Sequence, residues 1–454
     1  MRLTERLAAL PSPPERDRAF TFSAPHRARK QAVTLASPRT RELHGLGRQI
    51  RPTRVEIDLD AVQGNVAALA AAVAPARIIA VVKADAYGHG AVPVARALAG
   101  TPAVQAGALA VSLLEEALEL REHAVRGRIL VLGGFYGDHH VDVASHDLEA
   151  VVFTTPDLAR FAAVARAAGR RVRVHLKVDT GMSRLGLPHP DDDGGAALDA
   201  ALTLLRAHPE LELTGLLTHL AEADGADPAS ANTQLARFGP VCARVRAAGF
   251  APELHAGNSA AALRFPAARL DAVRPGLALY GIPPEPDVVP ATTPALRPAM
   301  RFVTEVIALR DIPVGRHVSY DGLFEARRPT RIAVLPVGYA DGYPRRLSGR
   351  GEILIGGQRC PVAGAVCMDM TMVDVTDLPA PPQPGDEAVL LGAQGDAAPV
   401  TARELAERAE LSPYEIPCLL SKRVPRLYLP AAGPGEAAEM PSPDSAAPAQ
   451  RGQR

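Results

Sequence analysis

One lysine stands where a strand is predicted to pass into a loop. Lys83 follows the apolar run of residues 78–82 and precedes a polar, glycine-bounded stretch in the segment RIIAVVKADAYGHG. Because the run is wholly apolar and rich in β-branched residues, it predicts a strand buried on both faces. A lysine at the end of such a strand loses solvation of its charged form, which lowers its pKa and frees the amine for a Schiff base. Pyridoxal phosphate is the cofactor that uses a lysine in this way, although an isolated lysine after a strand is more often an ordinary surface residue.

Two further cations lie in the segment HLKVDTGMSRLG. Lys177 stands near the end of the apolar run 172–178, and Arg184 lies in the glycine-containing loop after it. An arginine in such a loop can bind a carboxylate through two parallel hydrogen bonds. Lys177 has a plainer alternative role, a salt bridge to Asp179 or another acid.

Two later runs end in groups that can contact an anion or an aromatic ring. His219 ends the run LTGLLTH, and His255, Asn258 and Ser259 lie close together in LHAGNSAA. The small residues around Ser259 permit the close backbone approach that an anion requires. Each histidine taken alone is more often structural than functional.

The order of the apolar runs predicts how these residues are positioned. Short apolar runs alternate with alanine-rich amphipathic segments such as residues 113–122 and 157–168, which is typical of repeated βα units. We therefore predict an α/β chain with a (β/α)8 TIM-like barrel, in which functional residues gather at the carboxyl ends of the strands. The predicted barrel strands are residues 78–82, 108–111, 129–132, 150–153, 172–178, 213–217, 253–255 and 271–273.

The rest of the chain predicts one more folded domain and two disordered ends. The segments RFVTEVIAL, RIAVLPVGY, GEILIGG, TMVDV and EAVLLG lie between Gly and Pro residues, which indicates a mostly β C-terminal domain. Residues 1–50 hold nine arginines and one lysine against four acids, and the tail is rich in Ala, Pro, Gly and Ser, so both ends are predicted to be disordered. A targeting or partner-binding arm is the alternative for the basic extension. The predicted parts are the extension 1–50, a cofactor-binding barrel 51–295, a β domain 296–430 and a tail 431–454.

The segment KADAYGHG resembles the cofactor-lysine signature of alanine racemases, the fold-type-III pyridoxal-phosphate enzymes. Further motifs follow in the family's order, and the resemblance covers residues 53–428. It implies that Lys83 carries the cofactor and that Tyr87 contacts the cofactor phosphate. It also implies that the early run 55–59 is a strand of the second domain, a pairing that periodicity alone cannot show.

The resemblance implies further contacts to the cofactor. Arg184 is expected to bond the cofactor's phenolic oxygen and to help bind the substrate, while Lys177, often carbamylated in the family, is expected to orient Arg184. The residues expected around the cofactor ring and phosphate are His219, His255, Asn258, Ser259 and the backbone amides of Gly276 and Leu277.

Arg274, in VRPGLALYG, is implied to face the pyridine nitrogen of the cofactor. An arginine keeps that nitrogen unprotonated and weakens the electron sink, which favours brief deprotonation and fast return of a proton over a long-lived carbanion. Racemisation is then preferred to transamination. If Lys83 were absent, Arg274 would be interpreted as an ion-pair residue at the barrel rim.

Tyr320, in HVSYDG, is the second acid/base candidate. Inversion of a stereocentre is simplest with two groups on opposite faces, one removing the α-proton while the other returns a proton. Lys83 and Tyr320 are the predicted catalytic pair, and His219 with nearby cations must lower the phenol pKa from about 10. The resemblance places this tyrosine in the neighbouring subunit's active site, so we predict a head-to-tail homodimer with composite sites. The alternative is a tyrosine buried for packing.

Two other motifs of the second domain concern the substrate. Met368 and Asp369, in GAVCMDM, match a substrate-carboxylate segment that the family contributes across the same interface. The last motif, YEIPCLLSKRVPRLY, departs at Lys422, where relatives are expected to have a phosphate-binding tyrosine. This departure leaves the shape of the pocket, and therefore the range of substrates, open.

Composition favours small-molecule chemistry. Lys+Arg and Asp+Glu both total 50, so the chain has no electrostatic footprint for nucleic acid or an anionic membrane. The four cysteines include no CxxC pair, which argues against a disulfide framework and a zinc site and fits a reducing cytoplasm. No long apolar stretch follows the basic N-terminus, so neither secretion nor a membrane span is predicted, and no metal is predicted.

The resemblance implies a cytoplasmic enzyme that interconverts L-alanine and D-alanine and supplies D-alanine for peptidoglycan. A broad-specificity amino-acid racemase is the nearest alternative, because the sequence does not measure the volume of the pocket. A non-catalytic pyridoxal-phosphate-binding regulator would have no use for Tyr320. A barrel decarboxylase would be expected to present an acid where this chain has Arg274.

Overall fold

The computed structural model describes residues 50–284 and 294–429, which all belong to one compact unit. The predicted basic extension, except for Ile50, and the predicted tail over residues 431–454 lie outside the described residues.

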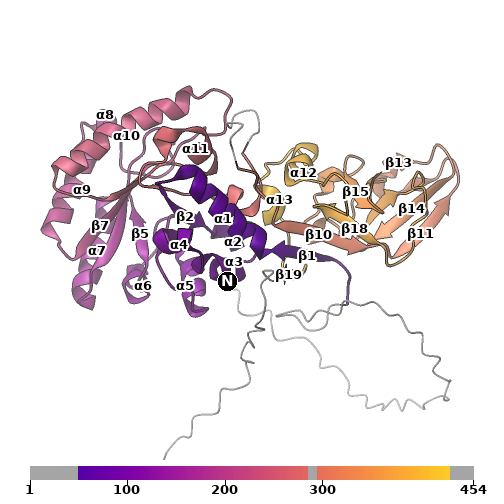
Figure 1. Cartoon of the computed structure of the whole chain (residues 1–454), viewed down its shortest axis with the longest axis horizontal. Coiled ribbons are helices and arrows are strands. Elements are labelled where there is room, and N and C mark those ends of the chain that lie inside the picture. The colour runs from indigo at the N-terminus through magenta and orange to yellow at the C-terminus, as the bar shows by residue number, and fades with distance from the viewer. Residues whose placement is uncertain (1–49, 285–293, 430–454) are drawn as a thin grey trace, which may run out of the picture. The chain divides into compact units, whose positions relative to one another are not determined.

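Eight parallel strands close into a barrel in chain order (Figure 1). The strands are short and largely buried because side chains fill the barrel interior while helices cover its outside. Each strand lies within two residues of its predicted run, so the predicted barrel is confirmed. The strands are β2 (Arg77–Val81), β3 (Ala108–Val111), β4 (Ile129–Val131), β5 (Glu149–Val152), β6 (Val172–Lys177), β7 (Leu211–Leu217), β8 (Glu253–His255) and β9 (Ala272–Val273).

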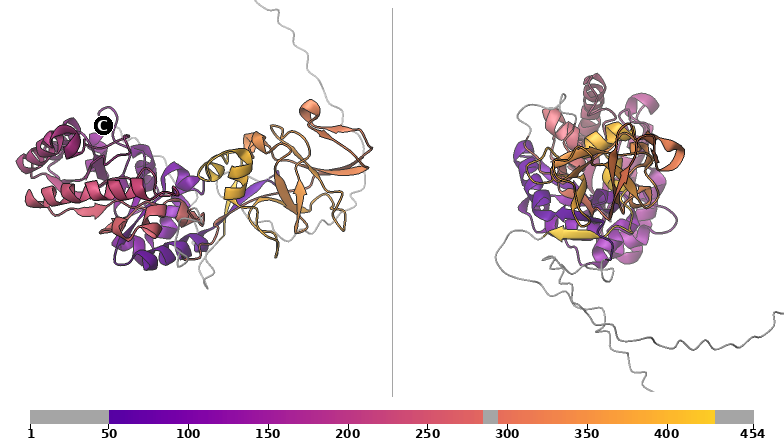
Figure 2. Two further views of the ribbon diagram at one scale, coloured as in Figure 1. Left: turned by 90° about the horizontal axis from the view of Figure 1, so that it is seen from above. Right: turned by 90° about the vertical axis from the view of Figure 1, so that its right-hand side faces the viewer.

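Helices alternate with these strands and cover the outside of the barrel (Figures 1 and 2). Apolar residues recur at helical spacing on one face of each long helix, and that face packs against the strands. The two helices predicted at residues 113–122 and 157–168 are present as α5 and α7. The helices are α1 (Leu59–Val73), α3 (Ala91–Ala99), α4 (Pro102–Ala106), α5 (Leu114–Glu122), α6 (His140–Ser145), α7 (Thr155–Ala168), α8 (Pro190–Asp193), α9 (Ala196–Ala207), α10 (Ala229–Ala247) and α11 (Ser259–Arg264). Over the described ranges, none of the helices combines the length and the apolarity that crossing a bilayer requires.

The second domain is mostly β, as predicted. Its six-stranded sheet contains, in spatial order, β16 (Gln358–Pro361), β15 (Glu352–Ile355), β18 (Glu387–Leu391), β10 (Met300–Glu305), β1 (Arg54–Asp58) and β19 (Arg426–Leu429). A three-stranded sheet contains β11 (Ala308–Ile312), β14 (Thr330–Leu335) and β17 (Thr371–Asp374), and a two-stranded ribbon contains β12 (His317–Val318) and β13 (Phe324–Glu325). The helices of this domain are α12 (Ala402–Ala409) and α13 (Glu415–Cys418).

Strand β1 joins the start of the described chain to the second domain. It pairs antiparallel with β10 and parallel with β19, which confirms the predicted return of residues 55–59 to that domain. Asp58, at the end of β1, then caps α1 by accepting a hydrogen bond from the backbone amide of Ala61 at 2.8 Å. The chain thus passes from the β sheet directly into the barrel.

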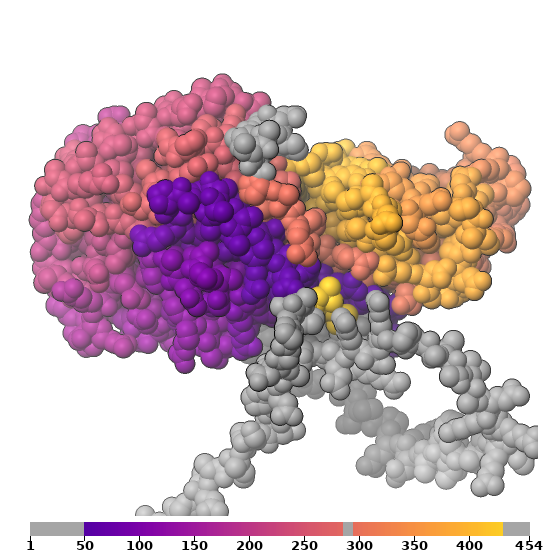
Figure 3. Space-filling model, in the orientation of Figure 1, coloured from indigo at the N-terminus to yellow at the C-terminus, as the bar shows by residue number. Residues whose placement is uncertain are grey.

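The two domains have separate hydrophobic cores that are linked by two shared residues. Leu59 and Ile282 pack against both cores. Arg426, in β19, donates a hydrogen bond from Nε to the carbonyl of Gly88 at 2.9 Å. The C-terminal residues, coloured orange to yellow in Figure 3, accordingly lie in contact with residues of the barrel.

Candidate active site

A cavity of about 550 Å³ lies at the carboxyl ends of the barrel strands. The loops after most of the strands contribute to its lining, as expected for the functional rim of a parallel barrel. Among the lining residues are Lys83, Tyr87, Lys177, Arg184, His219, Asn258, Ser259, Arg274, Gly276 and Leu277. The structure therefore brings together every barrel residue for which a site role is predicted except His255, which does not line the cavity but contacts Arg274.

Lys83 begins an unusual turn, α2 (Lys83–Tyr87). Residues 84–87 all have positive φ angles, of 52° to 53°, so they form one left-handed turn without a glycine. Left-handed backbone costs L-residues about 1–2 kcal/mol each, so neighbouring groups must stabilise it. The backbone amide of Ala84 donates to the Glu116 carboxylate at 2.6 Å, and the Asp85 carboxylate accepts from the first amide of α3 at 2.7 Å. Strained backbone of this kind clusters at functional sites.

The amine of Lys83 has a lowered pKa. Burial is the largest cause, followed by the positive charge of Arg184, while Glu116 acts in the opposite direction. This is the shift predicted from the position of Lys83 at a strand end. It reduces the free-energy cost of the neutral amine, which is the form that acts as a nucleophile or a base.

Lys177 is 7% exposed, and its pKa is lowered to about 8. Burial is the main cause, and the charges of Arg274 and Arg184 add to it, whereas Asp179 raises the pKa by a smaller amount. One Asp179 oxygen accepts hydrogen bonds from the amides of Gly181 and Met182, each at 2.8 Å. Asp179 therefore closes its own turn more than it neutralises Lys177.

Arg274 is 4% exposed and has hydrogen-bond partners on two sides. Its Nη1 donates to the carbonyl and to Nδ1 of His255, both at 2.8 Å. Its Nη2 donates to the carbonyls of Thr218 and Ala256 at 2.7 and 3.0 Å and lies 3.3 Å from Nδ1 of His219. Burial and then the charge of Arg274 hold the pKa of His219 well below its usual range, so that imidazole is neutral beside the cations.

A second group of lining residues suits a phosphate. Ser259 Oγ accepts the backbone amide of Gly276 at 2.9 Å, and the Asn258 side chain caps α11 by accepting from the Ala261 amide at 2.9 Å. A Cβ atom on Gly276 would lie 2.4 Å from the hydroxyl of Tyr87, so only glycine lets this hydroxyl approach the backbone. Backbone amides, hydroxyls and an amide side chain therefore converge there.

Tyr320, Met368 and Asp369 are not among the residues that line the cavity. All three lie in the second domain, and their side chains are largely exposed, with Tyr320 at 67%. The packing alternative for Tyr320 is therefore wrong. Exposure fits the prediction that these residues serve a neighbouring subunit.

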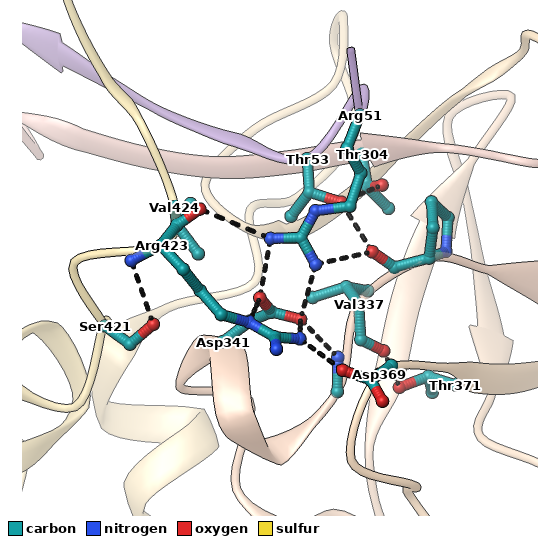
Figure 4. Close-up of polar contacts among 12 residues, drawn as sticks. Arg51, Thr53, Thr304, Val337, Asp341, Asp369, Thr371, Ser421, Arg423 and Val424 are labelled. Atoms are coloured by element: carbon teal, nitrogen blue, oxygen red, sulfur yellow. Dashed lines mark hydrogen bonds and ion pairs between the residues drawn. The ribbon is translucent and has the colours of Figure 1, made fainter. Parts of the chain in front are cut away.

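Asp369 is held in place by a cluster of charged groups (Figure 4). Arg423 donates to Asp369 Oδ1 at 2.6 Å and also to both oxygens of Asp341, at 2.7 and 3.2 Å. Asp341, in the 3-10 turn Tyr339–Asp341, is fully buried and is bound from its other side by Arg51 at 2.7 and 3.0 Å. The cluster thus fixes the loop that carries Met368 and Asp369 to the core of the domain.

One tyrosine of the last motif lines the cavity, and it does not stand at position 422. Tyr414 lines the cavity together with Cys418, whereas Lys422 does not. The rings of Tyr414 and Tyr87 lie 6.3 Å apart, so both phenols flank the same wall. Tyr414 begins the motif YEIPCLLSKR, eight residues before Lys422. Because Lys422 does not line the cavity, its side chain gives no reason to expect an altered pocket.

The barrel and its cationic cavity define a class, the barrel enzymes that hold pyridoxal phosphate on a lysine. Two family models match the chain: "Alanine racemase, N-terminal domain" over residues 57–284 and "Alanine racemase, C-terminal domain" over residues 299–428. The chain belongs to the alanine racemase family. It is thus an isomerase that depends on pyridoxal phosphate.

Similar proteins agree with this assignment over most of the chain. An alanine racemase of Sorangium cellulosum is 44% identical over 392 residues, which cover 84% of this chain and 99% of that protein. The crystal structure of alanine racemase from Streptomyces lavendulae has a TM-score of 0.76 and 38% identity, covering 85% of this chain and 98% of that one. The structure of alanine racemase from Bartonella henselae, with covalently bound pyridoxal phosphate, has a TM-score of 0.72 and 32% identity, covering 83% and 99%.

Proposed function

We propose that this cavity racemises alanine, with Lys83 and Tyr320 acting on opposite faces of the substrate. The observation that carries the proposal is the meeting of Lys83 and Arg274 in one cavity. A lysine with a lowered pKa can bind the cofactor and exchange a proton. An arginine at the cofactor ring limits the lifetime of a carbanion and so favours return of the proton to the same carbon.

The residues present fit pyridoxal phosphate. Lys83 offers the amine, and Ser259 and Tyr87 offer hydroxyls for the phosphate, together with the amides of Gly276 and Leu277, beside Asn258. When bound, the cofactor supplies an electron-withdrawing ring that acidifies the α-proton of the amino acid.

The hydrogen-bonding groups of Arg274 match the cofactor ring most specifically. Four of its N–H groups are directed to carbonyls and to the imidazole of His255. For the remaining Nε–H, no partner is found among the described residues. That group is available to a ring nitrogen, and the neutral His219 lies 3.3 Å from the neighbouring Nη2.

Arg184 and Lys177 both serve the anionic end of the substrate. Arg184 holds the carboxylate and the cofactor's phenolic oxygen, and Lys177 orients Arg184. Lys177 acts as a carbamate: its neutral amine adds carbon dioxide and releases a proton to water, so that an anion that pairs with arginine replaces a buried cation. Met368 and Asp369 complete the carboxylate site from the neighbouring subunit.

The proton transfers need two groups. The Lys83 amine removes the α-proton from one face, and the Tyr320 hydroxyl returns a proton to the other; the reverse reaction exchanges these roles. Tyr320 is exposed and lies outside the cavity of its own chain, so it acts in the partner of a head-to-tail homodimer.

Mixing two inactive variants tests the composite site. Lys83→Ala and Tyr320→Phe homodimers each lack one base in both sites. A heterodimer of the two has one site in which both bases are intact, so it regains about half of the unaltered turnover per dimer. The control pairs two differently tagged Lys83→Ala chains, which regain nothing. Heterodimers as inactive as their parents would show that both bases belong to one chain.

Substrate range separates this proposal from a broad-specificity racemase. Rates with serine, lysine and arginine are compared with the rate for alanine, and comparable values for the larger substrates would favour the broad enzyme. A regulator would bind the cofactor and form no D-amino acid. The product D-alanine supplies peptidoglycan synthesis in the cytoplasm, and recovery of the enzyme from a periplasmic fraction would contradict that location.

A further inference from the structure

A chain of buried polar side chains leads away from Arg274 through the inside of the barrel. His255, the last residue of β8, contacts Arg274, and its Nε2 lies 2.9 Å from Nδ1 of His175 in β6. Nε2 of His175 lies 2.9 Å from an oxygen of Glu149, the first residue of β5. All three are at most 1% exposed. Because the strands are parallel, the chain runs from the catalytic rim to the opposite rim.

Arg274 sets the direction of every hydrogen bond in this chain. A guanidinium has donors and no acceptor, so Nδ1 of His255 must be unprotonated. The proton of His255 is then on Nε2 and is donated to Nδ1 of His175. His175 consequently carries its own proton on Nε2 and donates it to the Glu149 carboxylate. A second proton on His255 would point at an N–H of Arg274, and a second proton on His175 would point at the N–H of His255. Both histidines therefore carry one proton and are neutral.

The barrel is shaped to admit His175. A Cβ atom on Gly215, in the neighbouring strand β7, would lie 1.9 Å from Nδ1 of His175, so any other residue at that position would displace the imidazole. The pairing of β6 with β7 also shifts register between Val174 and His175. A shift of this kind redirects a side chain, and here it occurs at the histidine.

The far end of the chain is fixed by charge. Burial alone would raise the pKa of Glu149, but hydrogen bonds from His175 and Arg128 lower it to about 2. Arg128 donates hydrogen bonds to both oxygens of Glu149, at 2.9 and 3.0 Å. It also forms an ion pair with Glu253, which pairs with Arg77 at 2.9 Å. Glu149 is therefore a permanent anion held in one position.

The folding stability of the barrel does not explain why these three polar side chains lie in its interior. Barrel interiors are filled mainly by branched apolar residues, and well-packed apolar residues can replace buried polar networks without loss of stability. The arrangement instead gives Arg274 neutral acceptors. A carboxylate in direct contact would cancel the guanidinium charge, whereas imidazoles fix its orientation and leave its positive potential directed at the cavity.

We propose that His255, His175 and Glu149 are positioning residues for Arg274, and that both histidines are neutral Nε2–H tautomers in the working enzyme. These side chains hold the guanidinium in one orientation through the contacts of its Nη1 with His255. This inference rests on the proposed function, since Arg274 serves the reaction only when the cofactor occupies the cavity.

Nitrogen NMR of the holoenzyme tests the tautomers directly. The protein is labelled with ¹⁵N-histidine, and long-range proton–nitrogen correlations distinguish the Nε2–H form, the Nδ1–H form and the imidazolium. Because the protein contains 13 histidines, their signals must be assigned. The signals of His175 and His255 are identified by their disappearance when each histidine is substituted singly. We expect both to be Nε2–H. An Nδ1–H form or an imidazolium at either position would overturn the proposal.

Substitution of His175 separates positioning from packing. In His175→Phe, His255 loses its acceptor, so kcat falls by about tenfold, the scale of one buried hydrogen bond, and the absorption of the bound cofactor shifts. His175→Gln, which keeps a donor and an acceptor, restores most of the rate. The matched control is Thr304→Val, which removes the buried 2.9 Å contact to Thr53 in the second domain and leaves kcat unchanged.

The outcomes can be told apart. If His175→Phe folds and matches Thr304→Val in kcat and cofactor absorption, the positioning role is wrong. If His175→Phe fails to fold, the tautomers of the unaltered protein still decide the matter. The tautomers are read without turnover, so a wrong tautomer refutes this inference alone, whereas absence of racemisation in the unaltered protein refutes the proposed function.

Discussion

Asp341 is predicted to be a main source of stability in the second domain. The substitution Asp341→Asn removes its charge and keeps its shape. The carboxylate is fully buried and accepts four hydrogen bonds from Arg51 and Arg423, at 2.7 to 3.2 Å, and a fifth from the Gly338 amide at 2.9 Å (Figure 4). An asparagine offers one acceptor oxygen in place of two and leaves both arginines without a counter-charge.

The expected loss of folding free energy depends on how deeply the carboxylate and the two arginines are buried. Removal of one partner from a buried ion pair costs about 3–5 kcal/mol. Arg51 and Arg423 keep 30% and 40% of their side-chain exposure, so water partly solvates them after the substitution. We therefore expect the lower end, a fall of about 3 kcal/mol in the free energy of unfolding.

Urea unfolding at a fixed protein concentration measures this loss, because association in a dimer adds to stability by mass action. The control is Asp369→Asn, the same chemical change on another partner of Arg423, with a side chain that is 56% exposed. Exposed pairs contribute about 0–1 kcal/mol, so the control should lose little. Equal losses in the two variants would refute the argument from burial.

Three further predictions concern the cavity and pH. Tyr414→Phe should weaken cofactor binding by about tenfold in equilibrium titrations, the scale of one hydrogen bond to a charged group, whereas Lys422→Ala should not change it; the reverse order would restore the role first given to Lys422. Carbamylation of Lys177 needs the neutral amine, so labelling with ¹³C-bicarbonate should rise as pH passes through about 8 and vanish in Lys177→Met; labelling that falls as pH rises would contradict the lowered pKa. Burial opposes ionisation of Asp341, but hydrogen bonds from Arg423 and Arg51 lower its pKa in the folded protein. The ionised carboxylate therefore stabilises the fold fully at pH values above its pKa in the unfolded chain, about 4. This stabilisation is lost as pH falls through the lower pKa of the folded protein. The stability gap between unaltered protein and Asp341→Asn should therefore shrink in acid, and a gap that persists at low pH would contradict this.

Much of the fold could be predicted because each barrel strand has a recognisable pattern in its own short segment of sequence. Each barrel strand is a short apolar run, and parallel strands buried on both faces require such runs. The positions of Lys83 and Arg274 at strand ends then follow from barrel geometry. Short pairs such as β12 and β13, with two residues each, have no such periodicity and were not predicted.

The features that were missed depend on contacts between distant segments. The left-handed turn of residues 84–87 opposes local backbone preference and is held by Glu116 from a later helix. His175 lies within an apolar run and looks like a packed residue until strands 26 and 80 residues away bring Glu149 and His255 beside it. Tyr414 was overlooked because a motif does not reveal which of its residues turns toward a cavity.

The proposed inversion of alanine requires exchange of its α-proton between Lys83 and Tyr320. The most direct measurement incubates the purified protein and pyridoxal phosphate with L-alanine in heavy water and follows both D-alanine formation and deuterium at the α-carbon. We predict D-alanine that carries deuterium in the unaltered protein, and almost none in Tyr320→Phe with cofactor still bound. Cofactor binding without either product, or a Tyr320→Phe variant as active as the unaltered protein, would contradict the account.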